Sequence, residues 1–294
     1  IGSRLVGSEM CIRDRDRIDR DVFQWKGQNF GWQRIYGGQV MAQCLIAANH
    51  TVKEPHQAHS FHSYFLRPGI MEESILFDVD RIRNGKSFTT RRVRAIQNGE
   101  AIFACSISFQ KEEKGFEHQI DIDLKEIPKP ENLPSDWELR NKAIEQLHGK
   151  KIDKFFLREQ EIEMRASQNN DYINPKKSKP VRDIWMRPNG EVPKDLIINQ
   201  ALLLYASDRG LLGTAQLPHG INFMSKYFQS ASLDHAMWFH SGVDFSDWML
   251  YRIDSPIAKN ARGFSRGSIF NSKGKLVASC VQEGLMRMWD KPKD

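Results

Sequence analysis

A carboxylate stands near the end of a long apolar segment. The segment LLLYASDRGLLG, residues 202–213, has the composition of a helix packed into a core, yet it contains Asp208. Burial raises the pKa of a carboxyl group toward neutrality, where the carboxylate can act as a general base on water. An aspartate near a helix end can also cap the helix or lie in solvent, so this segment alone leaves both interpretations open.

An amide interrupts an apolar strand face later in the chain. In KLVASCVQEGLM, residues 275–286, alternation places Leu276, Ala278, Cys280 and Gln282 on one face of a strand. A buried amide without a partner costs about 1–3 kcal/mol, so we expect Gln282 to be hydrogen-bonded. A neighbouring backbone group is a common partner, but two polar intrusions in the same part of the chain favour a shared purpose.

One helix and a set of alternating strands must position such side chains. The segment YGGQVMAQCLIAANHTV, residues 36–52, has apolar residues at helical spacing and almost no charge, which predicts a helix buried on all sides. Residues 59–110 alternate with a period of two, and Asn84-Gly85 and Asn98-Gly99 predict tight hairpin turns between the strands. The sequence therefore predicts a helix followed by an antiparallel meander.

The same pattern occurs twice in the chain. NGEAIFACSISF, from Asn98, matches KGKLVASCVQEG, from Lys273, without a gap at an offset of 175 residues. This offset sets three pairs of residues on one another: Cys105 on Cys280, Ile107 on Gln282, and Arg91 on Arg266.

Two further matches extend the repeat upstream. HSYFLRPG from His62 resembles HAMWFHSG from His235. The helix AQCLIAANHT resembles NQALLLYASD when the two glutamines of these segments are aligned, and this sets Thr51 on Asp208. The acid and the amide are therefore present in one half of the duplication only.

The duplication predicts two similar units joined by a linker. We expect an N-terminal unit over residues 16–112, a charged, proline-containing linker over 113–152 with a short helix around 137–147, and a C-terminal unit over 153–291 that begins with a strand near 155–166. The first fifteen residues resemble a translated sequencing adapter, so we exclude them and expect the natural N-terminus to lie outside this sequence.

Composition excludes several classes of protein. In 294 residues, 40% of them hydrophobic, no apolar run approaches the length of a membrane span. The net charge of +6 suits an anionic ligand but falls short of the clustered patches of nucleic-acid binders, and the single RGFSRG fragment favours a sheet segment over an RNA-binding motif. Cys44, Cys105 and Cys280 lie in apolar runs without metal-ligand spacing, which favours reduced thiols in a cytosolic protein and no zinc site.

From Asp19 to Trp289 the chain resembles the type II acyl-CoA thioesterases, the TesB-like family. The resemblance implies an α+β double hotdog fold, in which each unit has a long central helix wrapped by a curved antiparallel sheet, and it implies a hydrolase without metal or organic cofactor. The motifs that carry it, in order, are RIYGGQVMAQ, HSFHSYFLRPG, RIRNGKSFTTRRVRAIQNG, YASDRGLLGTA, SLDHAMWFH, ARGFSRG and LVASCVQEGLMR.

The resemblance also implies an active site. In the family an acid on the second central helix, a threonine or serine on the strand before DHAMWFH, and a glutamine on the last strand jointly hold a water molecule. Carried over by motif, these residues are Asp208, Ser232 and Gln282. Ser232 stands where many members have threonine, so the hydroxyl is kept and a methyl group is lost.

Accessory groups are expected around this set. Backbone N–H groups of Gly37, Gly38 and Gln39, at the positive end of a helix, can donate to the substrate carbonyl, although a tight turn is an equal alternative. His59 matches a family histidine near the site, with a structural role as its alternative. Arg91, Arg262 and Arg266 are candidate contacts to coenzyme A phosphates, with solvated strand faces as their alternative.

We therefore expect a cytoplasmic enzyme that hydrolyses medium- to long-chain fatty acyl-CoA to fatty acid and coenzyme A. We expect it to associate into dimers or tetramers, without a nucleic-acid partner or stable membrane insertion. One alternative is a non-catalytic hotdog protein that binds acyl-CoA or lipid. Another is a hotdog hydratase or dehydratase, which needs a histidine paired with the acid; no histidine accompanies Asp208 in its helix.

Overall fold

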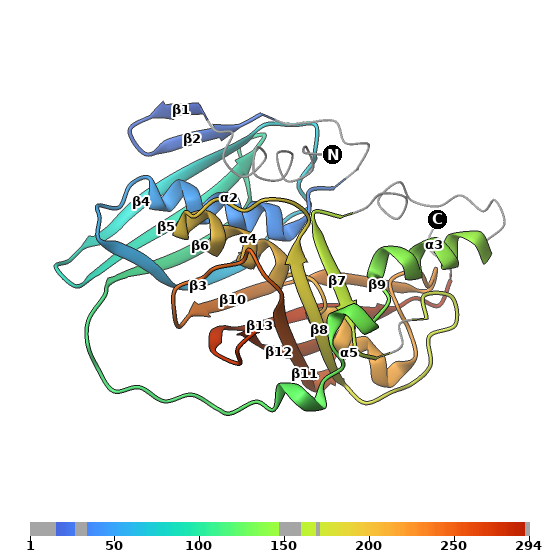
Figure 1. Ribbon diagram of the computed structural model, residues 1–294. Coiled ribbons are helices and arrows are strands. Elements are labelled where there is room, and N and C mark those ends of the chain that lie inside the picture. Colours follow the sequence, from blue (N-terminus) through green and yellow to red (C-terminus); the bar gives the residue numbers. More distant parts are fainter. Residues whose placement is uncertain (1–15, 27–33, 147–159, 169–170, 292–294) are drawn as a thin grey trace.

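The computed structural model describes residues 16–26, 34–146, 160–168 and 171–291, and the strands of this part form one antiparallel sheet (Figure 1). The segment expected to be adapter-like, residues 1–15, lies outside the described residues. The strands are β1 (Asp16–Asp19), β2 (Val22–Trp25), β3 (His56–Phe65), β4 (Ile75–Asn84), β5 (Phe88–Gln97), β6 (Glu100–Lys111), β7 (Ile162–Ala166), β8 (Val181–Pro188), β9 (Phe228–Ser232), β10 (Asp234–Phe239), β11 (Met249–Lys259), β12 (Arg262–Asn271) and β13 (Leu276–Met288).

The strand order repeats itself about the middle of the sheet. Strands β4-β5-β6-β3 on one side mirror β11-β12-β13-β10 on the other, and β3 pairs with β10 where the two halves join. Outside these sets, β2 pairs with β4 and β8 pairs with β11, while β9 pairs with β13. This order confirms the duplication predicted from the sequence.

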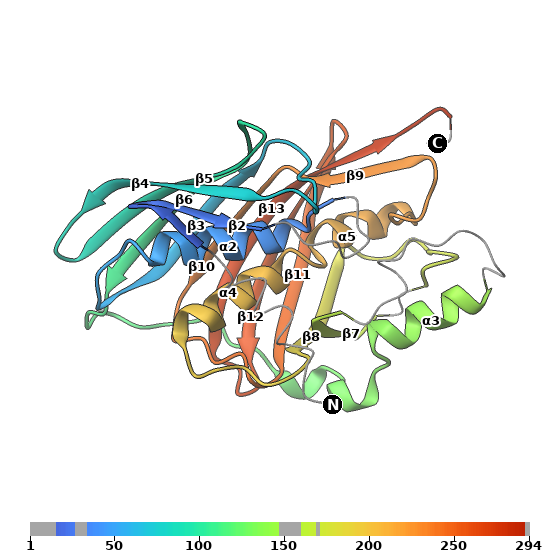
Figure 2. The ribbon, with the colours of Figure 1, turned by 90° about the horizontal axis from the view of Figure 1, so that it is seen from above.

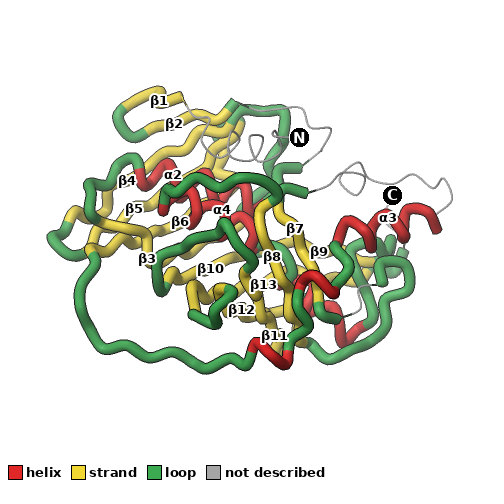
Figure 3. The backbone as a smooth tube through the Cα atoms, in the orientation of Figure 1, coloured by secondary structure: helices red, strands yellow, loops and turns green. Residues whose placement is uncertain are grey.

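Two of the helices lie against the sheet as a central pair (Figures 2 and 3). Almost every residue of α2 and of α4 is buried, which the scarcity of charge in both segments explains. The end of α4 meets the start of α2, where the Tyr36 hydroxyl donates to the Tyr205 carbonyl at 2.9 Å. The helices are α2 (Gly37–Asn49), α3 (Asp136–Gln146), α4 (Leu196–Ser207) and α5 (Leu211–Gln216), with 3₁₀ turns η1 (Leu124–Glu126), η2 (Pro130–Asn132) and η3 (Leu217–His219).

The hairpin turns follow the sequence signals with one difference. Asn98 and Gly99 have φ of 49° and 78° and form the predicted two-residue turn between β5 and β6. The turn predicted at Asn84-Gly85 is longer, because Asn84 pairs with Thr89 and the Gly85 N–H donates to the Phe88 carbonyl.

The segment between β6 and α3 runs along the lower side of the molecule (Figure 1). It ends at the sheet, where the Trp185 indole N–H donates to the Pro128 carbonyl at 2.9 Å, and Ile127 packs with Trp185, Leu250 and Phe270. The helix expected around residues 137–147 is α3. The strand expected near residues 155–166 is β7, and residues 155–159 lie outside the described part.

Strand pairing corrects two of the residue matches made from the repeat. Cys105 pairs with Ser63 and Val93, whereas Cys280 pairs with Met237 and Gly267. With Cys105 set on Cys280, these neighbours are 174 residues apart rather than 175. Because a shift of one residue exchanges the two faces of a strand, the inward counterpart of Arg91 is Ser265, and that of His235 is Phe61, not His62.

Candidate active site

Asp208 directly follows the last residue of α4, and its carboxylate accepts hydrogen bonds from three other elements. The Gly38 backbone N–H, at the start of α2, donates to Oδ2 at 3.0 Å. Gln282 Nε2 on β13 donates to Oδ1 at 2.7 Å, and Ser232 Oγ at the end of β9 lies 3.4 Å from the same oxygen. The structure therefore brings the three residues of the motif-based prediction together at one carboxylate.

Opposing influences act on the Asp208 carboxylate. Burial raises its pKa above the ordinary value of an aspartate and outweighs the hydrogen bonds from Gln282, Gly38 and Ser232, which lower it. The positive end of the α2 dipole also favours the charged form. Asp208 and Ser232 both keep some solvent exposure, so water can reach the pair.

Gln282 has a different environment at each end of its amide. Its side chain is buried, with Nε2 near two acceptors, Asp208 Oδ1 at 2.7 Å and His235 Nδ1 at 3.4 Å. Its carbonyl oxygen, Oε1, has no hydrogen-bond partner among the described residues. A buried carbonyl oxygen of this kind is one that a bound water molecule can satisfy.

The two glycines at the start of α2 allow its backbone to approach α4 closely. A Cβ atom at Gly38 would lie 2.4 Å from the Tyr205 carbonyl oxygen, and one at Gly37 would lie 2.8 Å from Asp208 Oδ2. The Gly38 N–H donates to Asp208, and the Gln39 N–H donates to the Tyr36 carbonyl at 3.1 Å. Two of the three N–H groups expected to face a substrate carbonyl are therefore engaged within the protein.

His235 on β10 is a residue of this cluster that the sequence did not reveal. Its imidazole is fully buried, with Nε2 at 3.1 Å from Ser207 Oγ and Nδ1 at 3.4 Å from Gln282 Nε2. Burial lowers the pKa of His235 to about 3. Alternation in SLDHAMWFH, which sets His235 with the buried Met237 and Phe239, is the signal that could have found it.

The remaining candidate residues lie apart from this cluster. Arg91 is 1% exposed, and its guanidinium donates to the Thr51 hydroxyl and to carbonyl groups, including that of Arg83. A side chain enclosed in this way is not available to a coenzyme A phosphate, and we leave it out of the proposed site. The other candidates have partners of their own: His59 with Ser108, Arg262 with Glu283, and Arg266 with Asp254.

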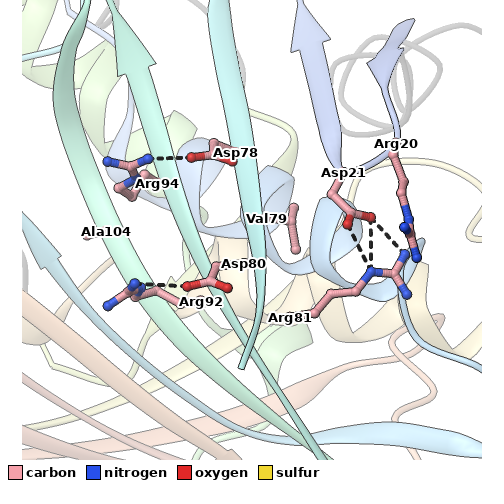
Figure 4. A pocket seen from close by; sticks show the side chains of 9 residues that line it. All are labelled: Arg20, Asp21, Asp78, Val79, Asp80, Arg81, Arg92, Arg94 and Ala104. Atoms are coloured by element: carbon pink, nitrogen blue, oxygen red, sulfur yellow. Dashed lines mark hydrogen bonds and ion pairs between the residues drawn. The ribbon is translucent and has the colours of Figure 1, made fainter. Parts of the chain in front are cut away.

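A charged hollow on the first unit is a separate feature (Figure 4). It measures about 800 Å³ and is lined by alternating acids and arginines. Within it Arg81 pairs with Asp21, and Arg94 pairs with Asp78. Asp208, Ser232 and Gln282 do not line this hollow.

Two searches over the described part of the chain limit other kinds of site. No group of three or more His, Cys, Asp or Glu side chains there is placed to hold a metal ion. Likewise, none of the helices in the described ranges is long and apolar enough to cross a membrane. The polar groups around Asp208 are therefore the ones whose chemistry we pursue.

The fold and this cluster define a double hotdog protein that carries its polar site in one unit. Among solved structures, acyl-CoA thioesterase II TesB2 from Mycobacterium marinum is similar, with a TM-score of 0.78 and 35% identity over 96% of this chain and 99% of that one. A hot dog fold protein from Alicyclobacillus acidocaldarius, with a TM-score of 0.76, 14% identity and coverage of 96% and 98%, supports the fold alone.

Sequence comparisons give the family. Residues 28–110 match the acyl-CoA thioesterase N-terminal domain, and residues 153–285 match the acyl-CoA thioesterase family. Acyl-CoA thioesterase 2 of Haemophilus influenzae is 36% identical over 97% of this chain and 99% of its own length, and human acyl-coenzyme A thioesterase 8 is 33% identical over 94% and 88%. The chain belongs to the acyl-CoA thioesterase family, a family of hydrolases.

Proposed function

We propose that the protein hydrolyses medium- to long-chain fatty acyl-CoA to a free fatty acid and coenzyme A. The observation that carries the proposal is the set of contacts at Asp208. A partly exposed carboxylate whose pKa is raised meets the Gln282 amide and the Ser232 hydroxyl in one unit of an acyl-CoA thioesterase fold. A thioester is already activated, so hydrolysis needs little more than an oriented, partly deprotonated water molecule and a polarised carbonyl.

In the proposed reaction Asp208 is the general base. Its Oδ2 accepts one hydrogen bond, from Gly38, and so keeps a lone pair for a proton of the water. Gln282 Oε1 accepts the other water proton as a hydrogen bond, and Ser232 Oγ contacts the water oxygen. General-base assistance of this kind contributes about 10²–10⁴-fold to a rate.

The bond changes balance without a further reactant. The water oxygen forms a bond to the thioester carbonyl carbon while its proton passes to Asp208. The tetrahedral intermediate then expels the coenzyme A sulfur as the C–S bond breaks. The proton held by Asp208 passes to the leaving thiolate, so the carboxylate is regenerated and the products are the fatty acid and the free thiol.

The negative oxygen of the intermediate needs a hydrogen-bond donor. At the start of α2, Gly38 and Gln39 use their N–H groups within the protein, whereas no partner is found for the Gly37 N–H among the described residues. We assign the donor role to the Gly37 N–H. It lies in the first turn of α2, where the helix dipole is positive.

The position of His235 weighs against a hydratase or dehydratase. Such an enzyme needs a histidine that reaches its substrate, but the His235 ring is fully buried and both of its nitrogens contact protein atoms. A purely binding role is the remaining alternative. It predicts acyl-CoA binding without release of thiol.

Thiol release from a series of acyl-CoA substrates, from short to long chains, tests the proposal. We expect turnover with a maximum at medium to long chains. Absence of thiol release with every chain length would refute the enzymatic function, and hydration of an enoyl-CoA would favour the hydratase alternative. Turnover confined to short chains would refute the proposed chain length alone.

Three broader expectations remain proposals. We propose that residues 16–112 and 153–291 are the two units and that 113–152 links them, which the packing of Ile127 against Trp185 supports. We propose a cytoplasmic location, supported by the free, buried thiols of Cys44, Cys105 and Cys280. We also propose that the protein forms dimers or tetramers.

A further inference from the structure

Three inward-facing positions differ in polarity between the two units. Strand pairing makes Phe61 and Ile107 of the first unit the counterparts of His235 and Gln282, while the helix match sets Thr51 on Asp208. Phe61 and His235 are both fully buried, so a histidine replaces a phenylalanine in an equally enclosed place. The fold of the first unit shows that the position does not require a histidine.

The amide of Gln282 can occupy its site in two orientations. In the observed one, Nε2 lies between Asp208 Oδ1 at 2.7 Å and His235 Nδ1 at 3.4 Å, and each acceptor faces one N–H bond. Rotation by half a turn would set Oε1 against the carboxylate and against the imidazole lone pair. The two acceptors together therefore favour the orientation in which Oε1 faces away from them.

The hydrogen bonds around His235 indicate which ring nitrogen carries the proton. Ser207 Oγ donates to the Leu204 carbonyl at 2.8 Å, so this oxygen accepts from His235 Nε2 at 3.1 Å. With the proton on Nε2, the lone pair of Nδ1 is free to accept from Gln282. Tyr251 donates to the Ser207 carbonyl at 2.9 Å and so holds the end of α4 in place.

We propose that His235 is a positioning residue, which orients the Gln282 amide so that its oxygen receives the water activated by Asp208. The inference rests on the proposed hydrolytic function. His235 reaches neither water nor substrate, because its ring is fully buried and both nitrogens are occupied by protein groups. Burial keeps it neutral, since its pKa of about 3 lies well below any working pH.

A double-mutant cycle between His235 and Gln282 tests the proposal. His235→Phe introduces the residue that the first unit has at this position, and Gln282→Met removes the amide at similar length. We expect His235→Phe to lower kcat on the order of tenfold or more with little change in KM. We expect the double variant to be no slower than Gln282→Met alone, because His235 acts only through Gln282.

Two further variants separate positioning from a structural role. His235→Asn keeps an acceptor near the place of Nδ1, so we expect it to retain more of the parent kcat than His235→Phe. Ser63→Ala is the matched control: its hydroxyl donates to the His235 backbone carbonyl at 2.8 Å and does not touch the ring. We expect Ser63→Ala to lower the melting temperature and to leave kcat unchanged.

Several results would overturn the proposal. One is a folded His235→Phe protein with parent kcat, and another is a double variant in which the two losses multiply. A third, which needs no activity, comes from ¹⁵N NMR of histidine-labelled parent protein: we expect a neutral ring protonated on Nε2, and a ring protonated on Nδ1 or on both nitrogens would refute the assignment. If the parent releases no thiol, the proposed function fails, while the NMR result still decides the hydrogen bonding of His235.

Discussion

At the residue scale, the Asp208 carboxylate must lose its proton before it can activate water. Because burial raises its pKa, the proposed base reaches its active form at a higher pH than an ordinary aspartate does. We expect kcat/KM to rise with pH on the acid side, with a midpoint above the ordinary aspartate pKa. A rate that stays flat down to the ordinary aspartate range would contradict this, and thiol release between mildly acidic and neutral pH measures it.

The same pKa shift has a consequence for stability, and its sign is opposite to that of activity. A carboxyl whose pKa is higher in the folded than in the unfolded state stabilises the fold below its unfolded pKa, and this contribution is lost as pH rises through the folded pKa. Asp208 therefore lowers stability at the pH where it is charged and able to act.

The sequence predicted two of the polar side chains of the cluster from composition alone and did not predict the third. Asp208 and Gln282 stand out because each interrupts an apolar periodicity. His235 was set on His62, because letter matching aligned the two histidines, while strand pairing sets it on Phe61. A match that is one residue out exchanges the faces of a strand, so a buried residue was compared with an exposed one.

At the element scale, the close approach of α2 to the end of α4 places the Gly38 N–H at the carboxylate. A Cβ atom at Gly38 would lie 2.4 Å from the Tyr205 carbonyl oxygen and 2.5 Å from the Tyr36 ring. We expect Gly38→Ala to lower both the melting temperature and kcat, because the helix start must move away from Asp208. Gly115→Ala, where an added Cβ meets nothing within 4 Å, is the matched control; equal effects of the two changes would contradict the argument.

Arg91 holds together three elements of the first unit. Its guanidinium donates to Thr51 at the end of α2, to the Arg83 carbonyl and Asn84 Oδ1 on β4, and to the Thr90 carbonyl on its own strand. We expect Arg91→Met to lower the free energy of unfolding by about 2–4 kcal/mol, since several buried acceptors lose their donor. We expect kcat per folded molecule to stay at the parent value. Denaturant unfolding and thiol release measure the two quantities, and a loss of kcat without loss of stability would contradict this role.

The fold could be predicted further than the site at this scale. The two buried helices, the meander and the linker helix follow from periodicity and repetition, because these depend on many residues. The engagement of the Gly38 and Gln39 N–H groups did not follow, because it depends on how α2 packs against α4. The burial of Arg91 was missed for a similar reason, since an arginine on an alternating strand is ordinarily expected in solvent.

At the scale of the whole molecule, one chain supplies both halves of a symmetric sheet but places the acid in one of them. Apolar side chains such as Tyr64, Leu66 and Ile82 are nevertheless exposed on the first unit. We expect the protein to form dimers or tetramers at micromolar concentration, as hotdog sheets commonly associate. Light scattering measures the mass, and a monomer at that concentration would contradict the expectation.

The asymmetry between the units also predicts how they respond to the same change. Ile107 is the counterpart of Gln282 in the first unit, where Thr51 replaces the acid. Ile107→Gln introduces the amide without the carboxylate, so we expect it to reduce stability and to leave thiol release unchanged. It serves as the control for the measurement that follows.

Substitution of the acid itself tests the central claim most directly. Asp208→Asn keeps the size of the side chain and removes the proton acceptor. We expect kcat for acyl-CoA hydrolysis to fall by about 10²-fold or more with little change in KM, in a protein that melts near the parent temperature. A folded Asp208→Asn protein that releases thiol at the parent rate would show that Asp208 is a structural residue and that hydrolysis, if it occurs, uses another base.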